Sequence, residues 1–195
     1  METFTSWPSW PKAEEPLARA LPPETVDALR AAVAFAREKH GLQQRPTGRP
    51  YLEHLLEALE VAVAGAGVTD GDVLVAIVLH DVLEDTPCTE AEIVRRFGPR
   101  VAEFVGWVTR PRGIAKADYL GSLVKAPPQA VLVKLADRVS NVQELQRMPW
   151  RFQRRYYLET VAYIMPLAGV HPWFAAWYGE WRRRWHRRVE RLSAY

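Results

Sequence analysis

Apolar residues recur at helical spacing along most of the chain. Positions 26, 29, 33 and 36 are apolar, and this stripe predicts a helix that begins near Glu24 and stops at Gly41. A second apolar stripe over 52–63 predicts another helix, which ends at Gly65. The segment between them, 42–50, is polar and rich in Pro and Gly, which is typical of a loop.

The run Val73–Leu79 is apolar at every position. Periodicity alone does not distinguish a buried strand from a buried helix in so short a run. We interpret it as a helix, because its neighbours are helical, with Asp70 or Asp72 as the N-cap.

The rest of the chain shows the same helical pattern, and no segment alternates with the period of a strand. The sequence therefore predicts an all-α protein, a bundle of about eight helices. Residues 1–23 hold five Pro and two Trp and are expected to form an irregular arm. The main domain is expected over 24–170. Residues 171–195 are expected to form a Trp- and Arg-rich helix that packs on the domain or extends it.

Composition and charge narrow the class of protein. The single cysteine, Cys88, excludes an intrachain disulfide and a Cys-rich zinc site. The N-terminus lacks a signal-peptide pattern and no apolar run could span a membrane, so we expect a cytoplasmic protein. The net charge is +3, but residues 180–191 carry six Arg and two Glu. The remainder is slightly acidic, so this segment is expected to be a solvated helix face, and nucleic acid is an unlikely partner.

Acidic groups and a histidine are concentrated directly after the apolar run. His80, Asp81, Glu84 and Asp85 lie within six residues, and Glu84 shares a helix face with His80. Such a set is costly to place beside a core unless a cation or protons compensate it. The alternative is a set of charged groups at an exposed helix end.

A second acid, Asp137, lies in a largely apolar helix after Pro127-Pro128. It is either a metal ligand or the partner of an internal ion pair with Lys134 or Arg138. Two imidazoles and two carboxylates suit Mn²⁺, Fe²⁺ or a similar ion. The residues themselves leave open whether His54 or His40 supplies the second imidazole.

Several sequence blocks follow one another in order over roughly residues 25–170. They are Phe35–His40, Gln43–Arg45 with Gly48, Pro50–His54, Leu79–Thr86, Phe97–Gly98, Val108–Thr109, Ala126–Pro128, Val133–Arg138 with Asn141, and Glu159–Ala168. Together these blocks resemble the hydrolase domain of RelA/SpoT homologues in the HD superfamily, and small alarmone hydrolases more closely.

The resemblance implies a metal site and a reaction. Its expected ligands are His54, His80, Asp81 and Asp137, with Glu84 and Asp85 as the catalytic acid pair. Substrate contacts are expected from Arg45, Lys134, Arg138 and Asn141. The expected reaction removes the 3′-pyrophosphate from guanosine tetra- or pentaphosphate, without synthetase activity, and uses Mn²⁺ or another divalent ion such as Fe²⁺ or Mg²⁺.

One position departs from the family pattern. Pro46 stands where family members often carry a Lys after the loop arginine. Arg49, Lys116 or Lys125 could supply the missing charge. The departure motivates an alternative in which the substrate is another nucleotide, such as an adenosine alarmone, NADPH, or an ordinary nucleotide. A homo-oligomer is also possible.

Overall fold

The structure, a computed structural model, describes the backbone of residues 1–192 and the side chains of residues 1–186. It confirms the all-α prediction: this range contains helices and one isolated bridge, between Gln44 and Pro50, but no strand. The α-helices are α1 (Trp10–Ala20), α2 (Pro23–His40), α3 (Tyr51–Glu60), α4 (Gly71–Leu79), α5 (Val82–Asp85), α6 (Glu90–Phe97), α7 (Pro99–Val108), α8 (Lys116–Ser122), α9 (Pro128–Val142), α10 (Trp150–Glu159) and α11 (Pro172–Leu192). Short π- or 3₁₀-helical segments are η1 (Val61–Gly65), η2 (Leu123–Lys125), η3 (Leu145–Arg147), η4 (Thr160–Ile164) and η5 (Met165–Val170).

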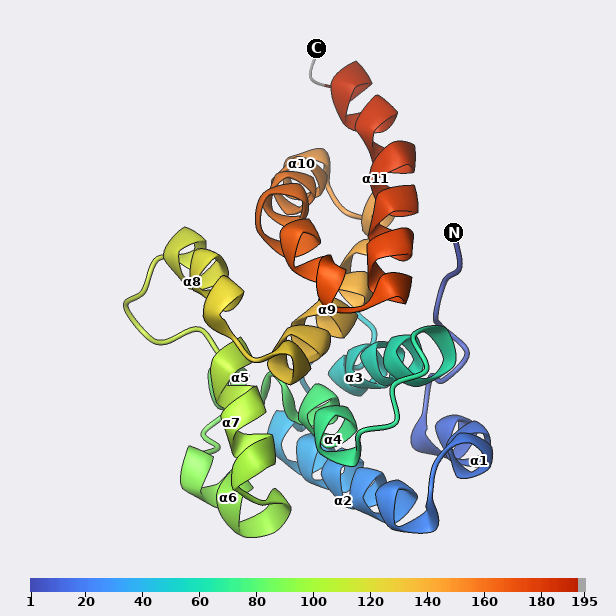
Figure 1. Ribbon diagram of the computed structural model, residues 1–195, viewed down its shortest axis with the longest axis vertical. Coiled ribbons are helices and arrows are strands. Elements are labelled where there is room, and N and C mark those ends of the chain that lie inside the picture. The colour runs from blue at the N-terminus through green and yellow to red at the C-terminus, as the bar shows by residue number, and fades with distance from the viewer. Residues whose placement is uncertain (193–195) are drawn as a thin grey trace.

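Helix α4 lies at the centre of the bundle and confirms the helical interpretation of Val73–Leu79. Every residue of that run is buried, and α2, α3, α7 and α9 pack around it (Figure 1). Asp70 caps the helix, because its carboxylate accepts the backbone N–H groups of Asp72 at 3.1 Å and Val73 at 3.3 Å. A helix that is apolar all round is stable only when neighbours cover every face, and here they do.

The prediction of an irregular arm over 1–23 is wrong for its second half, because residues 10–20 form α1. Pro11 lies in the first turn, where a helix needs no backbone N–H from it. Ala13 and Leu17 are one turn apart and fully buried, so α1 has an apolar face that packs on α2 and α3. The density of Pro in this segment obscured that stripe.

The C-terminal helix α11 packs on the domain through its aromatic face. Tyr178 and Trp181 are fully buried, and their polar atoms reach α9. The Tyr178 hydroxyl donates to the Leu135 carbonyl at 2.8 Å, and Trp181 Nε1 donates to the Val142 carbonyl at 3.2 Å. The side chains of the last three arginines of the basic segment, Arg187, Arg188 and Arg191, lie outside the described residues, whereas the arginines at 182–184 are exposed.

Trp181→Ala is expected to lower the free energy of unfolding by about 3–5 kcal/mol, because it empties a fully buried site and removes a hydrogen bond to α9. Chemical denaturation followed by circular dichroism measures the change. Trp107→Ala, at a partly exposed position of α7, is the matched control and should lower the free energy of unfolding by clearly less. Equal losses in the two variants would contradict the packing role of α11.

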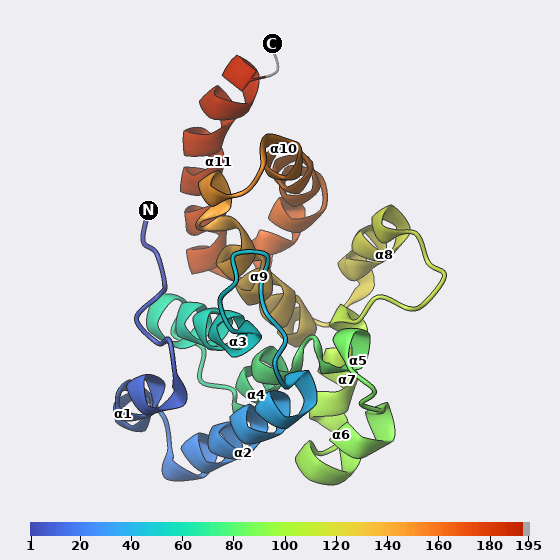
Figure 2. The same cartoon turned by 180° about the vertical axis from the view of Figure 1, so that it is seen from behind.

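Three elements meet at one face of α4 and define where chemistry can occur. They are α3, the turn from α4 into α5, and α9 (Figure 1). Helix α8, which the sequence pattern did not predict, and α10 stand beside them. The loop over 41–50 lies against α3 and α9 on the side seen in Figure 2. No described helix combines the length and the apolar character needed to cross a bilayer.

Candidate active site and metal centre

The four ligands predicted from the resemblance lie together where α3, α4 and α9 meet. His54 Nε2 lies 3.2 Å from His80 Nε2 and 3.3 Å from Asp137 Oδ1. Asp81 Oδ2 lies 2.9 Å from His80 Nε2 and 3.7 Å from His54 Nε2. His54, His80 and Asp137 are buried and have ligand atoms within 4.8 Å of one another. These donors are spaced as a single divalent cation requires.

The end of α4 explains how two adjacent residues face the same point. The helix stops at Leu79, and His80 and Asp81 form the turn that precedes α5. Adjacent residues inside a helix would point about 100° apart. The turn relaxes that constraint, so both side chains reach the site while the apolar run before them stays in the core.

Each imidazole is oriented by a hydrogen bond from its other nitrogen. His54 Nδ1 lies 2.8 Å from Ser140 Oγ, and His80 Nδ1 lies 2.7 Å from the carbonyl oxygen of Ile77. The Ile77 carbonyl only accepts, so His80 carries a proton on Nδ1 and turns Nε2 toward the donor set. Oriented imidazoles of this kind are typical of metal ligands, and the donor set fits a divalent metal ion.

The carboxylates of the donor set are held in the charged form. Burial alone would raise the pKa of Asp137, but Lys134 Nζ, 2.8 Å from Asp137 Oδ2, and the two histidines lower that pKa well below its usual value. Burial opposes His80 charging as well, yet the adjacent carboxylates raise its pKa well above the usual value. The two carboxylates are therefore ionised and attract cations, and a metal ion that binds here would displace the proton from His80 Nε2.

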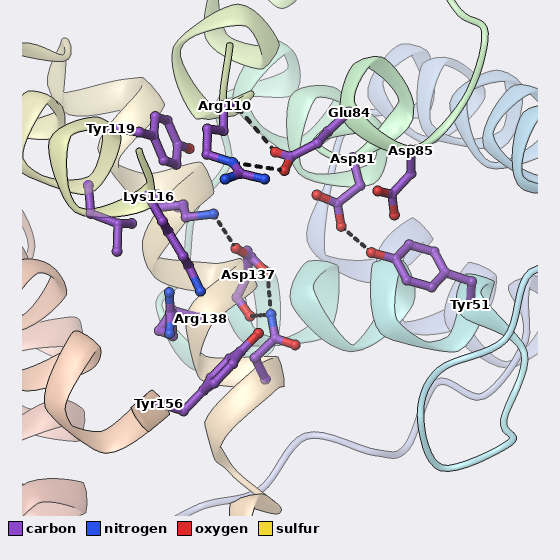
Figure 3. A pocket seen from close by; sticks show the side chains of 13 residues that line it. Tyr51, Asp81, Glu84, Asp85, Arg110, Lys116, Tyr119, Asp137, Arg138 and Tyr156 are labelled. Atoms are coloured by element: carbon purple, nitrogen blue, oxygen red, sulfur yellow. Dashed lines mark hydrogen bonds and ion pairs between the residues drawn. The ribbon is translucent and has the colours of Figure 1, made fainter. Parts of the chain in front are cut away.

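A cavity of about 270 Å³ opens beside the donors and has two sides of opposite charge (Figure 3). Asp81, Glu84 and Asp85 lie along one side, and Lys116 and Arg138 lie across from them. The complete lining is Tyr51, Asp81, Glu84, Asp85, Arg110, Lys116, Tyr119, Leu120, Lys134, Asp137, Arg138, Asn141 and Tyr156. The cavity can therefore hold a cation on its acidic side and anionic groups on its basic side.

The predicted acid pair comes from α5, a single turn that directly follows the ligands. Glu84 Oε2 accepts the backbone N–H of Arg110 at 3.1 Å, and Glu84 Oε1 lies 3.6 Å from Arg110 Nε. Asp85 Oδ2 accepts from Gln43 Nε2 at 2.9 Å. Both carboxylates thus have a polar partner and still line the cavity.

The basic side is built around Glu159 and Tyr156. Lys116 Nζ lies 2.7 Å from Glu159 Oε2, and Arg138 NH1 lies 3.6 Å from the same oxygen. Both cations also lie against the Tyr156 ring, at 5.0 and 4.8 Å from its centroid. Two cations share one carboxylate, so this corner keeps a positive charge available for an anion.

Three of the four predicted substrate-binding residues line the cavity, and Arg45 does not. Lys134 pairs with Asp137, and Asn141 Nδ2 donates to Asp137 Oδ1 at 2.5 Å. The Arg45 side chain is only 12% exposed and is bound to Glu57, 2.7 Å away, behind His54. Its position does not support the phosphate contact that the resemblance implied.

His40, the other candidate imidazole, lies outside the ligand cluster. Its Nδ1 lies 2.8 Å from Gln43 Oε1, and its ring packs on Tyr51 with centroids 4.8 Å apart. Tyr51 in turn donates its hydroxyl proton to Asp81, and its own pKa is raised by burial and by the Asp81 charge. Of the two imidazoles that the sequence left open, the structure brings only His54 to the site.

Sequence reasoning missed Tyr51, Arg110, Tyr119 and Tyr156 as lining residues. Tyr51 precedes His54 by three positions and so shares its helix face, a signal that was available. The adjacent Tyr156 and Tyr157 carry no such signal, since only tertiary packing decides which of them faces the cavity. Tyr157 is buried against Trp181, with ring centroids 5.5 Å apart.

Comparisons with known proteins agree with this geometry. A model of the HD domain family matches residues 32–171. A guanosine-3′,5′-bis(diphosphate) 3′-pyrophosphohydrolase of Aquifex aeolicus is 38% identical over 154 residues, which are 75% of this chain and 22% of that protein. The chain thus spans less than a quarter of the length of this bacterial relative.

Relatives of similar length to this chain match over more of their own length. The guanosine-3′,5′-bis(diphosphate) 3′-pyrophosphohydrolase MESH1 of Danio rerio is 37% identical over 135 residues, 65% of this chain and 75% of that protein. The solved structure of a metazoan ortholog of SpoT, described as hydrolysing ppGpp, superimposes with a TM-score of 0.74 at 27% identity, over 80% of this chain and 94% of the other. The chain belongs to the HD domain family and is homologous to the SpoT and MESH1 hydrolases.

Proposed function

We propose that this protein is a metal-dependent pyrophosphohydrolase that removes the 3′-pyrophosphate from guanosine tetra- or pentaphosphate, with Mn²⁺ as its metal. The observation that carries the proposal is one cavity lined by the donors Asp81 and Asp137, by the pair Glu84 and Asp85, and by the basic side of Lys116 and Arg138. The other two donors, His54 and His80, have Nε2 atoms within 3.7 Å of those two carboxylates. The names of its relatives specify the substrate. Fe²⁺ or Mg²⁺ are the alternative ions for the same donor set.

The residues divide the chemistry between them. A divalent metal held by His54, His80, Asp81 and Asp137 would supply a Lewis acid and lower the pKa of water. Water attacks the phosphorus bonded to the 3′-oxygen, the bond between them breaks, and the products are pyrophosphate and GDP or GTP. Glu84 and Asp85 line this space and can take the proton from water and return one to the 3′-oxygen.

The basic side of the cavity, formed by Lys116 and Arg138, can neutralise the negative charge of the substrate. Such a substrate carries several phosphates, and positioned cations stabilise the charge that moves during phosphoryl transfer. Lys116 and Arg138 are aimed at the cavity, and Arg110 lies at its acidic rim. Burial lowers the pKa of Lys116, and the nearby Glu159 opposes that change. A phosphate entering the cavity would add to the effect of Glu159 and favour the charged amine.

Lys116 is the cation in this chain that best replaces the one missing at Pro46. Of the three substitutes suggested by the sequence, Lys116 lines the cavity, Arg49 pairs with Glu53, and Lys125 is exposed on η2. Lys116→Met is expected to raise KM roughly 10- to 100-fold, because it removes a charge-assisted hydrogen bond to phosphate. Steady-state kinetics measure the change. Lys125→Met is the matched control and should leave KM unchanged; an equal rise in both would contradict the assignment.

The alternative function is hydrolysis of another nucleotide by the same centre, which the proline at position 46 motivates. A substrate panel separates the two. Guanosine tetraphosphate, an adenosine alarmone, NADPH and deoxynucleoside triphosphates would each be incubated with the protein and Mn²⁺, and kcat/KM compared. The proposal expects the kcat/KM for guanosine tetraphosphate to exceed that for every other compound by at least about tenfold. This factor corresponds to about 1.4 kcal/mol in transition-state binding. A higher value for any of the others would reject it.

A further inference from the structure

A buried carboxylate lies directly behind the metal donors and takes no part in the chemistry described above. Glu57 follows His54 by one turn of α3 and is 2% exposed. A carboxylate in the core is tolerated only when it is paired and hydrogen-bonded. Its two oxygens have four partners: Ser140 Oγ at 2.8 Å, Arg45 NH1 at 2.7 Å, Arg49 NH1 at 3.3 Å and Gln143 Nε2 at 3.4 Å.

These contacts fix the direction of the hydrogen bonds that lead to the metal site. Two guanidinium groups face Glu57, so it is a carboxylate and can only accept. The single hydroxyl proton of Ser140 is therefore donated to Glu57, and Ser140 Oγ can only accept from His54 Nδ1, 2.8 Å away. The chain of bonds leaves His54 Nε2 free and points it at the donor set.

The two histidines of the site thus depend on different kinds of support. His80 is held by a backbone carbonyl, that of Ile77, which no side-chain substitution removes. His54 is held by Ser140 of α9, which Glu57 of α3 holds in turn. Both arginines that pair with Glu57, Arg45 and Arg49, come from the loop over 41–50. The loop position that the resemblance assigned to phosphate binding lies here behind the metal site.

We propose that Glu57 and Ser140 are positioning residues that hold His54 for the metal, and that Arg45 serves them as the charge partner of Glu57 and does not bind phosphate. The inference rests on the proposed metal site. Hydrogen bonds to the outer nitrogen of a metal-bound imidazole typically change metal affinity by roughly 10- to 100-fold. Removal of Ser140 or Glu57 is expected to have an effect of that size.

The test is Mn²⁺ affinity, measured on the purified protein by the electron paramagnetic resonance signal of free Mn²⁺. Ser140→Ala and Glu57→Gln are expected to bind Mn²⁺ roughly 10- to 100-fold more weakly than the wild type. Thr160→Val is the matched control, since it removes a different buried hydroxyl, which donates to the Tyr156 carbonyl and has no hydrogen bond to a donor, and it should bind Mn²⁺ normally. Melting of the metal-free proteins verifies that the variants fold.

Arg45→Met keeps the proposal testable even if a core variant does not fold, because it changes a loop residue. It is expected to weaken Mn²⁺ binding several-fold while KM at saturating Mn²⁺ stays within about twofold of the wild type. Unchanged Mn²⁺ affinity with a KM raised tenfold or more would overturn the proposal. If the wild type bound no Mn²⁺, the proposed function would fail as well; if it bound Mn²⁺ and folded Ser140→Ala bound equally well, only this inference would fail.

Discussion

Asp81→Asn is expected to fold like the wild type and to lose hydrolysis of guanosine tetraphosphate in the presence of Mn²⁺. The carboxylate is one of the four proposed donors, and an amide binds a divalent cation far less well than a carboxylate does. The loss of kcat/KM should exceed the roughly 100-fold upper limit typical of groups that only orient a ligand. The measurement is kcat/KM together with Mn²⁺ affinity and the melting temperature of the metal-free protein.

Asp137→Asn should also lose Mn²⁺-dependent hydrolysis, but unlike Asp81→Asn it should lower the free energy of unfolding as well. Asp137 pairs with Lys134, whose side chain is only 12% exposed, and removing one partner of a buried ion pair costs about 3–5 kcal/mol. Asp81 has no lysine or arginine partner among the described residues, and its side chain is 21% exposed. Near-normal Mn²⁺-dependent activity in either variant would show that the four donors do not form the metal centre.

The second large effect is expected at the acid pair. Glu84→Gln and Asp85→Asn should each lower kcat by roughly 10²- to 10⁴-fold, the usual contribution of a positioned acid or base. Neither residue belongs to the donor set, so Mn²⁺ affinity should stay close to that of the wild type. The measurement is kcat at saturating Mn²⁺, with affinity determined in parallel.

The control for the acid pair is Glu103→Gln, which neutralises an exposed carboxylate on α7 away from the cavity and should leave kcat unchanged. A fall in Mn²⁺ affinity large enough to account for the lost activity would contradict the separate roles of the pair and the donors. If only one of the two substitutions lowers kcat, that residue alone transfers the proton and the other positions water or substrate.

Much of the fold was predictable because apolar spacing is set by local geometry. The helix predicted from near Glu24 to Gly41 spans Pro23–His40, and of the two predicted N-cap candidates, Asp70 and Asp72, it is Asp70 that caps α4. Helix α1 was not predicted, because Pro residues hid a short stripe formed by Ala13 and Leu17. Propensity describes the isolated segment, whereas α1 is stabilised by packing on α2 and α3.

The candidate site was predictable where ligands are close in sequence, and less so where distant elements meet. His80, Asp81, Glu84 and Asp85 form a local pattern, whereas the position of Asp137 beside them depends on the packing of α9 against α4. The side of α10 that faces the cavity likewise depends on packing, which brings Tyr156 and not Tyr157 to it. The contact between Arg45 and Glu57 could not be read from spacing, since a long flexible side chain has several partners within reach.

The most direct test of the proposed function is the identity of the products from guanosine tetraphosphate, resolved by ³¹P nuclear magnetic resonance in ¹⁸O-labelled water with Mn²⁺. The account predicts GDP and pyrophosphate in equal amounts, with one ¹⁸O in the pyrophosphate and none in GDP, and no reaction with Asp81→Asn. Release of inorganic phosphate, label in the nucleotide, or equal turnover by Asp81→Asn would contradict it.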